Sequence, residues 1–201
     1  MKDWERCKTF KERSEWVELQ FMAAAASHGY RVLKPWGDSL EYDVAVEHSA
    51  GMIRVQVKSS SVRNGTGYFC QFRRNLLVKE PYSIEGLDIF ATYIIPEEVR
   101  YLIPAAVLLT PPRKVGITVC PMTALRKNRY RYERYREAWD LLAKSRCDLI
   151  AQGKTHAAYI RSLTKATSND RARRHRKRSG LGRTPALSRR RAKRGEGVGL
   201  P

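Results

Sequence analysis

The stretch EYDVAVEHSAGMIRVQVKSS, residues 41–60, decides the fold. Two runs of alternating apolar and polar residues flank the short segment HSAG, and such a pattern is typical of a β-hairpin. In the second run the apolar residues alternate with Arg54, Gln56 and Lys58. Because successive strand residues face opposite sides, we expect Gln56 and Lys58 to share one face of a strand. Asp43 stands at the start of the preceding strand.

A helix is predicted before this hairpin. Thr9 followed by Glu12 matches a capping box, which marks a helix start. The segment from about Phe10 to Ser27 has apolar residues at helical spacing, namely Trp16, Leu19, Ala23 and Ala26. Gly29 follows the segment, where a left-handed residue often ends a helix.

Further strands are predicted after the hairpin. The pair Asn64-Gly65 is a strong turn signal for a second hairpin. LDIFATYII, residues 87–95, is almost continuously apolar, which indicates a strand buried on both faces. VRYLIP, residues 99–104, fits an antiparallel neighbour joined through a turn at Pro96–Glu98. The helix followed by strands predicts an α/β or α+β fold with a mixed central sheet.

The chain is expected to have three parts. Residues 1–120 form the predicted α/β domain, and residues 121–160 form a helical C-terminal extension with a helix from Met122 to about Gln152. The tyrosines of that helix are read as core residues, with base stacking as the alternative. Residues 161–201 are rich in Arg, Lys, Ser, Gly and Pro, so we expect a disordered tail.

The charge of the chain indicates a polyanionic partner. The formal net charge is +19 over 201 residues. Residues 161–201 hold 14 Lys and Arg against two acids, and the remaining 160 residues hold 25 against 18. The tail predicts salt-dependent, sequence-blind binding to phosphates, although a dispensable extension is the alternative. We find no apolar run of the ~18 residues that a membrane span needs and no signal-peptide segment, so a cytoplasmic protein is expected.

The hairpin residues suggest a metal site facing a phosphodiester. Asp43 offers a carboxylate, Gln56 an amide oxygen, and the Val57 backbone a carbonyl, which are ligands suited to a hard cation. Lys58 lies about 7 Å from Gln56 along the strand and could act on a water molecule or on the phosphate. Glu18 on the predicted helix is a further acid that could reach the strand ends. The four cysteines and four histidines are scattered and predict neither zinc site nor disulfide framework.

The chain resembles the PD-(D/E)XK nuclease superfamily, most closely the branch of group I intron-encoded homing endonucleases that has Q-x-K in place of (D/E)-x-K. The resemblance covers residues 8–104 in four ordered blocks: ERSEWVELQF, KPWGDSLEYDVAV, IRVQVKSS and LDIFATYIIPEEVRYLIP. It implies a restriction-endonuclease-like core and a Mg²⁺-dependent DNA endonuclease, with Mn²⁺ as the other ion. It also implies that the catalytic residues are Glu18, Asp43, Gln56 and Lys58, and that Asp43, Glu18 and Gln56 are metal ligands. The Val57 carbonyl, which lies between Gln56 and Lys58 on the strand, is expected to be a further ligand.

Two departures and several alternatives accompany this resemblance. Gln56 removes one negative charge from the cation site, and Tyr42-Asp43 stands where the motif has Pro-Asp. Glu15 competes with Glu18, one turn earlier on the helix. Asp38 competes with Asp43 but is predicted to lie in a turn, and Asp88 is expected to be structural.

The candidate DNA contacts are less specific. Arg63, Arg73 and Arg74 flank the second hairpin and either bind phosphates or form an ordinary basic surface. The expected function is a homing-type endonuclease on double-stranded DNA, acting as a homo-oligomer because two cuts are easiest with two sites. The alternatives are a non-catalytic nucleic-acid-binding protein on a nuclease fold, and a resolvase, restriction or repair nuclease.

Overall fold

The computed structural model describes residues 3–37, 39–49, 51–65, 67–73, 82–110, 115–121, 127–158 and 160–161. Residues Met1–Leu163 form one compact unit, and residues Thr164–Pro201 form a second unit. The predicted disordered tail therefore lies almost wholly outside the described residues. In the described part of the chain, no helix has the length and apolar character needed to span a bilayer.

The first long element is helix α1, Phe10–Ser27, after the short 3-10 helix η1, Asp3–Arg6. The predicted capping box is confirmed: the Thr9 hydroxyl accepts the Glu12 N–H at 3.1 Å, and the Glu12 carboxylate accepts the Thr9 N–H at 3.2 Å. These bonds satisfy backbone donors that the first helical turn leaves without partners. Gly29, with φ +82°, ends the helix in the left-handed region as predicted.

The buried face of α1 differs from the predicted stripe. Its buried residues are Val17, Phe21 and Ala25. Leu19 is 59% exposed, and of the predicted stripe Trp16 packs against the core. Because residues 21–26 are apolar all round the helix, periodicity alone does not determine which side faces the sheet.

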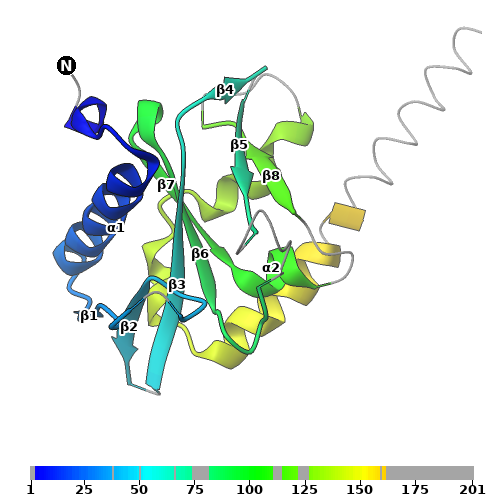
Figure 1. Ribbon diagram of the computed structural model, residues 1–201. Coiled ribbons are helices and arrows are strands. Elements are labelled where there is room, and N and C mark those ends of the chain that lie inside the picture. The colour runs from blue at the N-terminus through cyan, green and yellow to red at the C-terminus, as the bar shows by residue number, and fades with distance from the viewer. Residues whose placement is uncertain are drawn as a thin grey trace, which may run out of the picture. The chain divides into compact units, whose positions relative to one another are not determined.

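The central sheet has five strands in the order β1-β2-β3-β6-β7, as Figure 1 shows. Strands β1 to β3 and the pair β6–β7 are antiparallel, whereas β3 and β6 are parallel, so the predicted mixed sheet is confirmed. The strands are β1 Val32–Leu33, β2 Val44–His48, β3 Gly51–Ser60, β6 Ile89–Ile94 and β7 Val99–Pro104.

Two turns of this sheet behave as expected. The β2–β3 hairpin closes at His48 opposite Gly51. Between β6 and β7 the chain forms the 3-10 turn η2, Ile95–Glu97, followed by Glu98 in the left-handed region. Every residue of β6 is buried, which confirms the prediction of a strand covered on both faces.

A second sheet of three strands has the order β4-β5-β8. These strands are β4 Arg63–Asn64, β5 Gly67–Gln71 and β8 Gly116–Val119, and the short helix α2, Ala105–Leu109, follows β7. The hairpin predicted at Asn64-Gly65 is present, with Asn64 opposite Gly67 and Gly65 at φ +60°.

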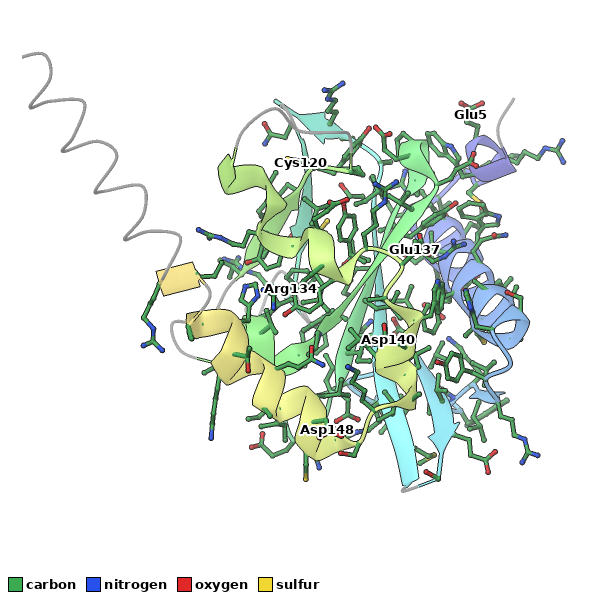
Figure 2. All side chains as sticks on the ribbon, turned by 180° about the vertical axis from the view of Figure 1, so that it is seen from behind. Glu5, Cys120, Arg134, Glu137, Asp140 and Asp148 are labelled. Carbon is green, nitrogen blue, oxygen red and sulfur yellow. The ribbon has the colours of Figure 1, made fainter. Side chains whose placement is uncertain are left out.

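The predicted helix over Met122–Gln152 is only partly correct. The structure has two 3-10 helices, η3 Lys127–Tyr135 and η4 Trp139–Ala143, and an α-helix that begins at residue 146. Figure 2 shows Glu137 at the junction of η3 and η4, where its φ of 47° interrupts the helical path. The Glu137 N–H donates to the Arg100 carbonyl at 2.8 Å, so pairing with β7 overrides helix propensity at this point.

The apolar residues of this region pack in the same core as the sheet. Tyr132, Tyr135, Trp139, Leu142 and Leu149 are all buried in a cluster that also contains residues of α1 and β6. Tyr132 and Tyr135 are therefore core residues, which confirms the preferred prediction for these two tyrosines.

Candidate active site

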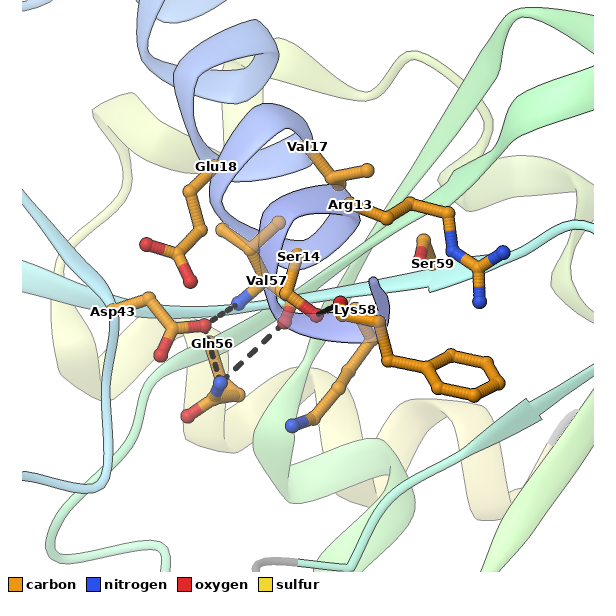
Figure 3. Close-up of a pocket in the computed structure, with 10 residues that line it drawn as sticks. Arg13, Ser14, Val17, Glu18, Asp43, Gln56, Val57, Lys58 and Ser59 are labelled. Carbon is orange, nitrogen blue, oxygen red and sulfur yellow. Dashed lines mark hydrogen bonds between the residues drawn. The ribbon is translucent and has the colours of Figure 1, made fainter. Parts of the chain in front are cut away.

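A cavity of about 310 Å³ opens where α1 lies beside the start of β2 and the middle of β3. Figure 3 shows Glu18 above this cavity and Asp43, Gln56 and Lys58 around it. The cavity brings together all five predicted catalytic or metal-binding residues: Glu18, Asp43, Gln56, Val57 and Lys58. The other lining residues are Phe10, Arg13, Ser14, Val17 and Ser59.

Asp43 is held in place by the strand pairing next to it. Its backbone N–H donates to the Val55 carbonyl at 3.0 Å, immediately before β2 begins. Its Oδ2 accepts the backbone N–H of Val57 at 2.8 Å, at a position where β3 has no partner residue in β2. The carboxylate therefore satisfies a strand donor and is fixed by it.

Burial and the groups around Asp43 have opposite effects on the pKa of its carboxylate. Burial is the largest effect and raises the pKa of Asp43. The Val57 N–H, the charge of Lys58 and the Gln56 amide act in the opposite direction. The other carboxylate oxygen, Oδ1, accepts no hydrogen bond from the described residues, which leaves it available to a ligand.

Gln56 is 5% exposed and points toward Asp43. Its amide nitrogen donates to Asp43 Oδ2, and a second contact of 3.4 Å reaches the Val57 carbonyl oxygen. The amide oxygen is the atom that the sequence predicts to bind a cation. In this structure the nitrogen faces the carboxylate, and a half-turn about the terminal torsion, which is broad and roughly two-fold, exchanges the two atoms.

Lys58 leaves β3 on the same side as Gln56, as strand alternation predicts (Figure 3). Burial lowers the pKa of Lys58, and the negative charges of Asp43 and Glu18 oppose that effect. Its ammonium lies over the Tyr82 ring at 5.6 Å from the ring centre. A lysine with a lowered pKa has a larger neutral fraction at a given pH, which suits it to accept a proton.

Glu18 is the helix acid that reaches the cavity. Its side chain is 18% exposed and forms an ion pair with Lys34. Burial is the largest effect on its pKa and raises it. Glu15 does not line this cavity; it is more exposed and lies 4.0 Å from Lys11. The structure thus favours Glu18 over Glu15.

The donor set fits a hard divalent cation. Glu18 and Asp43 supply carboxylate oxygens, and the Val57 carbonyl and the Gln56 amide supply neutral oxygens. Among the described residues, no group of three His, Cys, Asp or Glu side chains could hold a metal ion. A cation at this site would therefore depend on the neutral ligands as well as on the two acids.

Four other candidates are not among the described residues that line the cavity. Arg63 is exposed on β4 and Arg73 follows β5, and neither lines the cavity. Asp38 and Arg74 lie outside the described residues. Their predicted roles stay predictions.

Asp88 is structural, as the sequence analysis expected. It is 4% exposed and accepts the Arg54 backbone N–H at 2.9 Å. The Arg54 side chain donates to Asp88 at 2.9 and 3.1 Å, and the Arg146 guanidinium lies at 3.1 Å. Two arginines therefore surround this buried carboxylate, which does not line the cavity.

Sequence reasoning missed Arg13 and Ser14 on the first turns of α1 and Ser59 on β3. The Arg13 guanidinium lies over the Phe10 ring at 4.8 Å and makes no ion pair with a described residue. The available signal was the spacing of Ser14, which lies four residues before Glu18 and therefore on the same helix face, whereas the five-residue spacing of Arg13 gave no such signal. Arg13 gives the cavity lining a second cation for an anionic ligand, on the side away from the Lys58 ammonium (Figure 3).

Comparisons with known proteins agree with the fold. A family model described as PD-(D/E)XK endonuclease matches residues 9–142, about two thirds of the chain. A solved bacterial homing endonuclease, I-Ssp6803I, is similar with a TM-score of 0.56 and 24% identity, over 76% of this chain and 99% of that one. At this identity the likeness shows the fold. A comparison with curated proteins gives no match.

Proposed function

This chain belongs to the PD-(D/E)XK endonuclease family, and we propose that it is a divalent-metal-dependent endonuclease that hydrolyses phosphodiester bonds in double-stranded DNA. The observation that carries the proposal is the meeting of Glu18, Asp43, Gln56 and Lys58 in one cavity. These residues come from a helix, a strand start and a second strand, so their meeting is not a consequence of sequence proximity alone.

We propose Mg²⁺ as the cofactor, with Mn²⁺ as an alternative ion. Asp43 and Glu18 would hold it, together with the Gln56 amide oxygen and the Val57 carbonyl. A divalent cation in such a site polarises a phosphoryl oxygen and stabilises the charge that develops during hydrolysis. Because Gln56 is neutral, the negative charge of the site depends on the two carboxylates.

Lys58 orients the attacking water and accepts its proton. Burial lowers its pKa and so increases the fraction of neutral amine that can accept this proton, while the charges of Asp43 and Glu18 act in the opposite direction. The strand backbone fixes the point at which the side chain leaves β3, so the ammonium is directed into the cavity (Figure 3). Positioning of this kind is a large part of the catalytic effect in hydrolytic sites.

Arg13 holds a phosphate of the bound strand. Its guanidinium lines the cavity, lies over the Phe10 ring and has no acidic partner among the described residues. A planar guanidinium can donate two parallel hydrogen bonds to phosphate oxygens. The net charge of +19 favours DNA binding in general, whereas Arg13 acts next to the reacting group.

We assign a homing-type role acting as a homo-oligomer. The similar fold of a bacterial homing endonuclease supports the role, and the need to cut two strands supports the oligomer. Two tests address these points. Cleavage confined to one long asymmetric site would support homing, and light scattering of the protein with and without DNA measures the number of subunits.

The central test is cleavage of a supercoiled plasmid with Mg²⁺, with Mn²⁺ and with EDTA. Wild type is expected to cleave with either ion and to be inactive in EDTA. Asp43→Asn and Lys58→Met are expected to lose cleavage while retaining the circular dichroism spectrum of wild type. Equal cleavage by wild type and both variants would contradict the site assignment.

A second candidate is a non-catalytic DNA-binding protein on the same fold. It is favoured by the hydrogen bond from Gln56 to Asp43, which occupies a carboxylate oxygen that a metal ion would otherwise use. Tight DNA binding without cleavage in either ion would support this candidate. A resolvase, restriction or repair nuclease shares the same core and would differ in its preferred DNA substrate.

A further inference from the structure

Lys34 brings a second ammonium to the acidic side of the site. It follows β1 directly in the chain, and its Nζ forms an ion pair with the Glu18 carboxylate. The Lys34 side chain is 50% exposed, whereas that of Glu18 is 18% exposed. The pair therefore joins a solvent-accessible cation to a largely buried acid.

The Lys34–Glu18 pair lies at two neighbouring cavities. The first is the 310 Å³ cavity that contains Lys58, and the second has a volume of about 540 Å³ and contains Lys34. Both cavities are lined by Ser14, Glu18 and Asp43. The two carboxylates thus line both cavities, with Lys58 in the first and Lys34 in the second.

The charges of these four groups balance. Lys58 interacts favourably with both Asp43 and Glu18, and Lys34 also interacts favourably with both of them. In the described part of the chain, the other charged groups lining the two cavities are Arg13, Lys11 and Glu15, and the last two pair with each other. Two acids are therefore matched by two ammonium groups while Gln56 stays neutral.

We propose that Lys34 is a built-in counter-ion of the catalytic site: it positions Glu18 in the ion-free protein and gives up this carboxylate when a divalent cation binds. The proposal rests on the proposed metal-dependent function. Lys34 is a positioning residue, since it acts through Glu18 and does not line the cavity that holds Lys58.

This arrangement has two opposite consequences. A divalent cation must break the Lys34–Glu18 pair before it can use both Glu18 oxygens, so Lys34 weakens cation binding. In the ion-free protein the same ammonium offsets repulsion between Glu18 and Asp43, so Lys34 stabilises the fold there. The site is consequently kept intact without metal, at some loss of metal affinity.

The experiment compares Lys34→Gln with Lys11→Gln in the full chain without DNA. Lys11 is a matched control because it also pairs with a glutamate of α1 and lines the 540 Å³ cavity, yet its side chain is 81% exposed. Calorimetric titration with Mn²⁺ and Mg²⁺ at low ionic strength measures affinity. Lys34→Gln is expected to bind about 3- to 10-fold more tightly, a change of up to about 1.4 kcal/mol, and Lys11→Gln within about twofold of wild type.

Three further measurements make the test specific. Lys34→Arg keeps the charge and is expected to restore wild-type affinity. In Glu18→Gln, the added Lys34→Gln change is expected to have no effect on affinity, because the coupling runs through the carboxylate. In EDTA at pH 8, Lys34→Gln is expected to unfold at a lower temperature than Lys11→Gln.

The outcomes separate this proposal from the proposed function. If wild type binds Mn²⁺ and cleaves DNA while Lys34→Gln binds no more tightly than wild type, the counter-ion role is wrong and the nuclease assignment stands. If wild type neither binds these ions nor cleaves, both proposals are wrong. If Lys34→Gln fails to fold even with Mn²⁺, the Glu18→Gln background decides the point. A change in Mn²⁺ affinity when Lys34→Gln is added to Glu18→Gln would contradict the proposal, and so would a Lys34→Arg affinity that differs from wild type.

Discussion

Gln56 donates its side-chain amide to the same oxygen of Asp43 that accepts the Val57 backbone N–H. One carboxylate oxygen is thus held by two donors, while the other accepts no hydrogen bond within the described part of the chain. A carboxylate at position 56 would remove one donor and add a negative charge beside Asp43. The neutral glutamine therefore suits the ion-free state, whereas an acid would suit the metal-bound state.

Gln56→Glu is expected to make stability depend on metal. In EDTA its free energy of unfolding should fall by about 1–3 kcal/mol, because a buried charge loses its donor and faces Asp43. Saturating Mg²⁺ should recover most of this loss. Urea denaturation with and without Mg²⁺ measures both values. The matched control is Gln71→Glu, because Gln71 is an exposed residue of β5, and equal stability of the two variants in EDTA would contradict the expectation.

Asp43→Asn and Lys58→Met are expected to reduce plasmid cleavage by at least about 100-fold, since each removes a charged group that acts on the reacting phosphate or water. Single-turnover rates with Mg²⁺ measure the effect. Asp140→Asn is the control, because the Asp140 side chain is 72% exposed and lies outside the cavity. A tenfold or smaller effect of both site variants would show that the chemistry lies elsewhere.

The ion-free protein is expected to lose stability as pH rises above about 4. Burial raises the pKa of both Asp43 and Glu18 above their ordinary values of 3.8 and 4.5. Between the ordinary and the raised values the folded state holds more protons than the unfolded state, so the free energy of unfolding falls with pH. Urea denaturation in EDTA between pH 4 and 7 measures the slope. The double variant Glu18→Gln/Asp43→Asn should have a smaller slope of unfolding free energy against pH. An unchanged slope would show that these two carboxylates are not its cause.

Arg13→Gln is expected to weaken DNA binding about equally for all sequences and to reduce the slope of log affinity against log salt by about 1, because one phosphate contact is lost. Fluorescence anisotropy with a short duplex at several salt concentrations measures both. Arg31→Gln is the control, since Arg31 is 82% exposed and pairs with Glu47. If the two variants have the same salt slope, Arg13 does not contact a phosphate.

Asp88→Asn is expected to lower the free energy of unfolding by about 3–5 kcal/mol, because Arg54 and Arg146 lose the buried charge that they surround. The rate of cleavage per folded molecule should stay within about twofold of wild type. Urea denaturation and active-site-normalised cleavage measure the two effects. A stable but inactive variant would instead indicate that Asp88 takes part in the reaction.

Much of the local structure could be predicted because it depends on neighbouring residues. The capping box of Thr9 and Glu12 and the turn at Gly65 need only short-range geometry. The side of α1 that is buried could not be predicted, since residues 21–26 are apolar on every side. The break at Glu137 was equally hidden, because it results from pairing with Arg100 in β7.

The sequence by itself determined the elements of the hairpin and the shared face of Gln56 and Lys58, because side-chain direction in a strand alternates with every residue. It also pointed to Glu18 and Asp43 through a family resemblance. The tertiary structure alone decided that the Gln56 nitrogen faces Asp43, that Arg13 enters the cavity and that Lys34 pairs with Glu18. These contacts join segments that are separated in the chain. The interactions between their charges are strong only where side chains are buried, and burial is created by the packed fold.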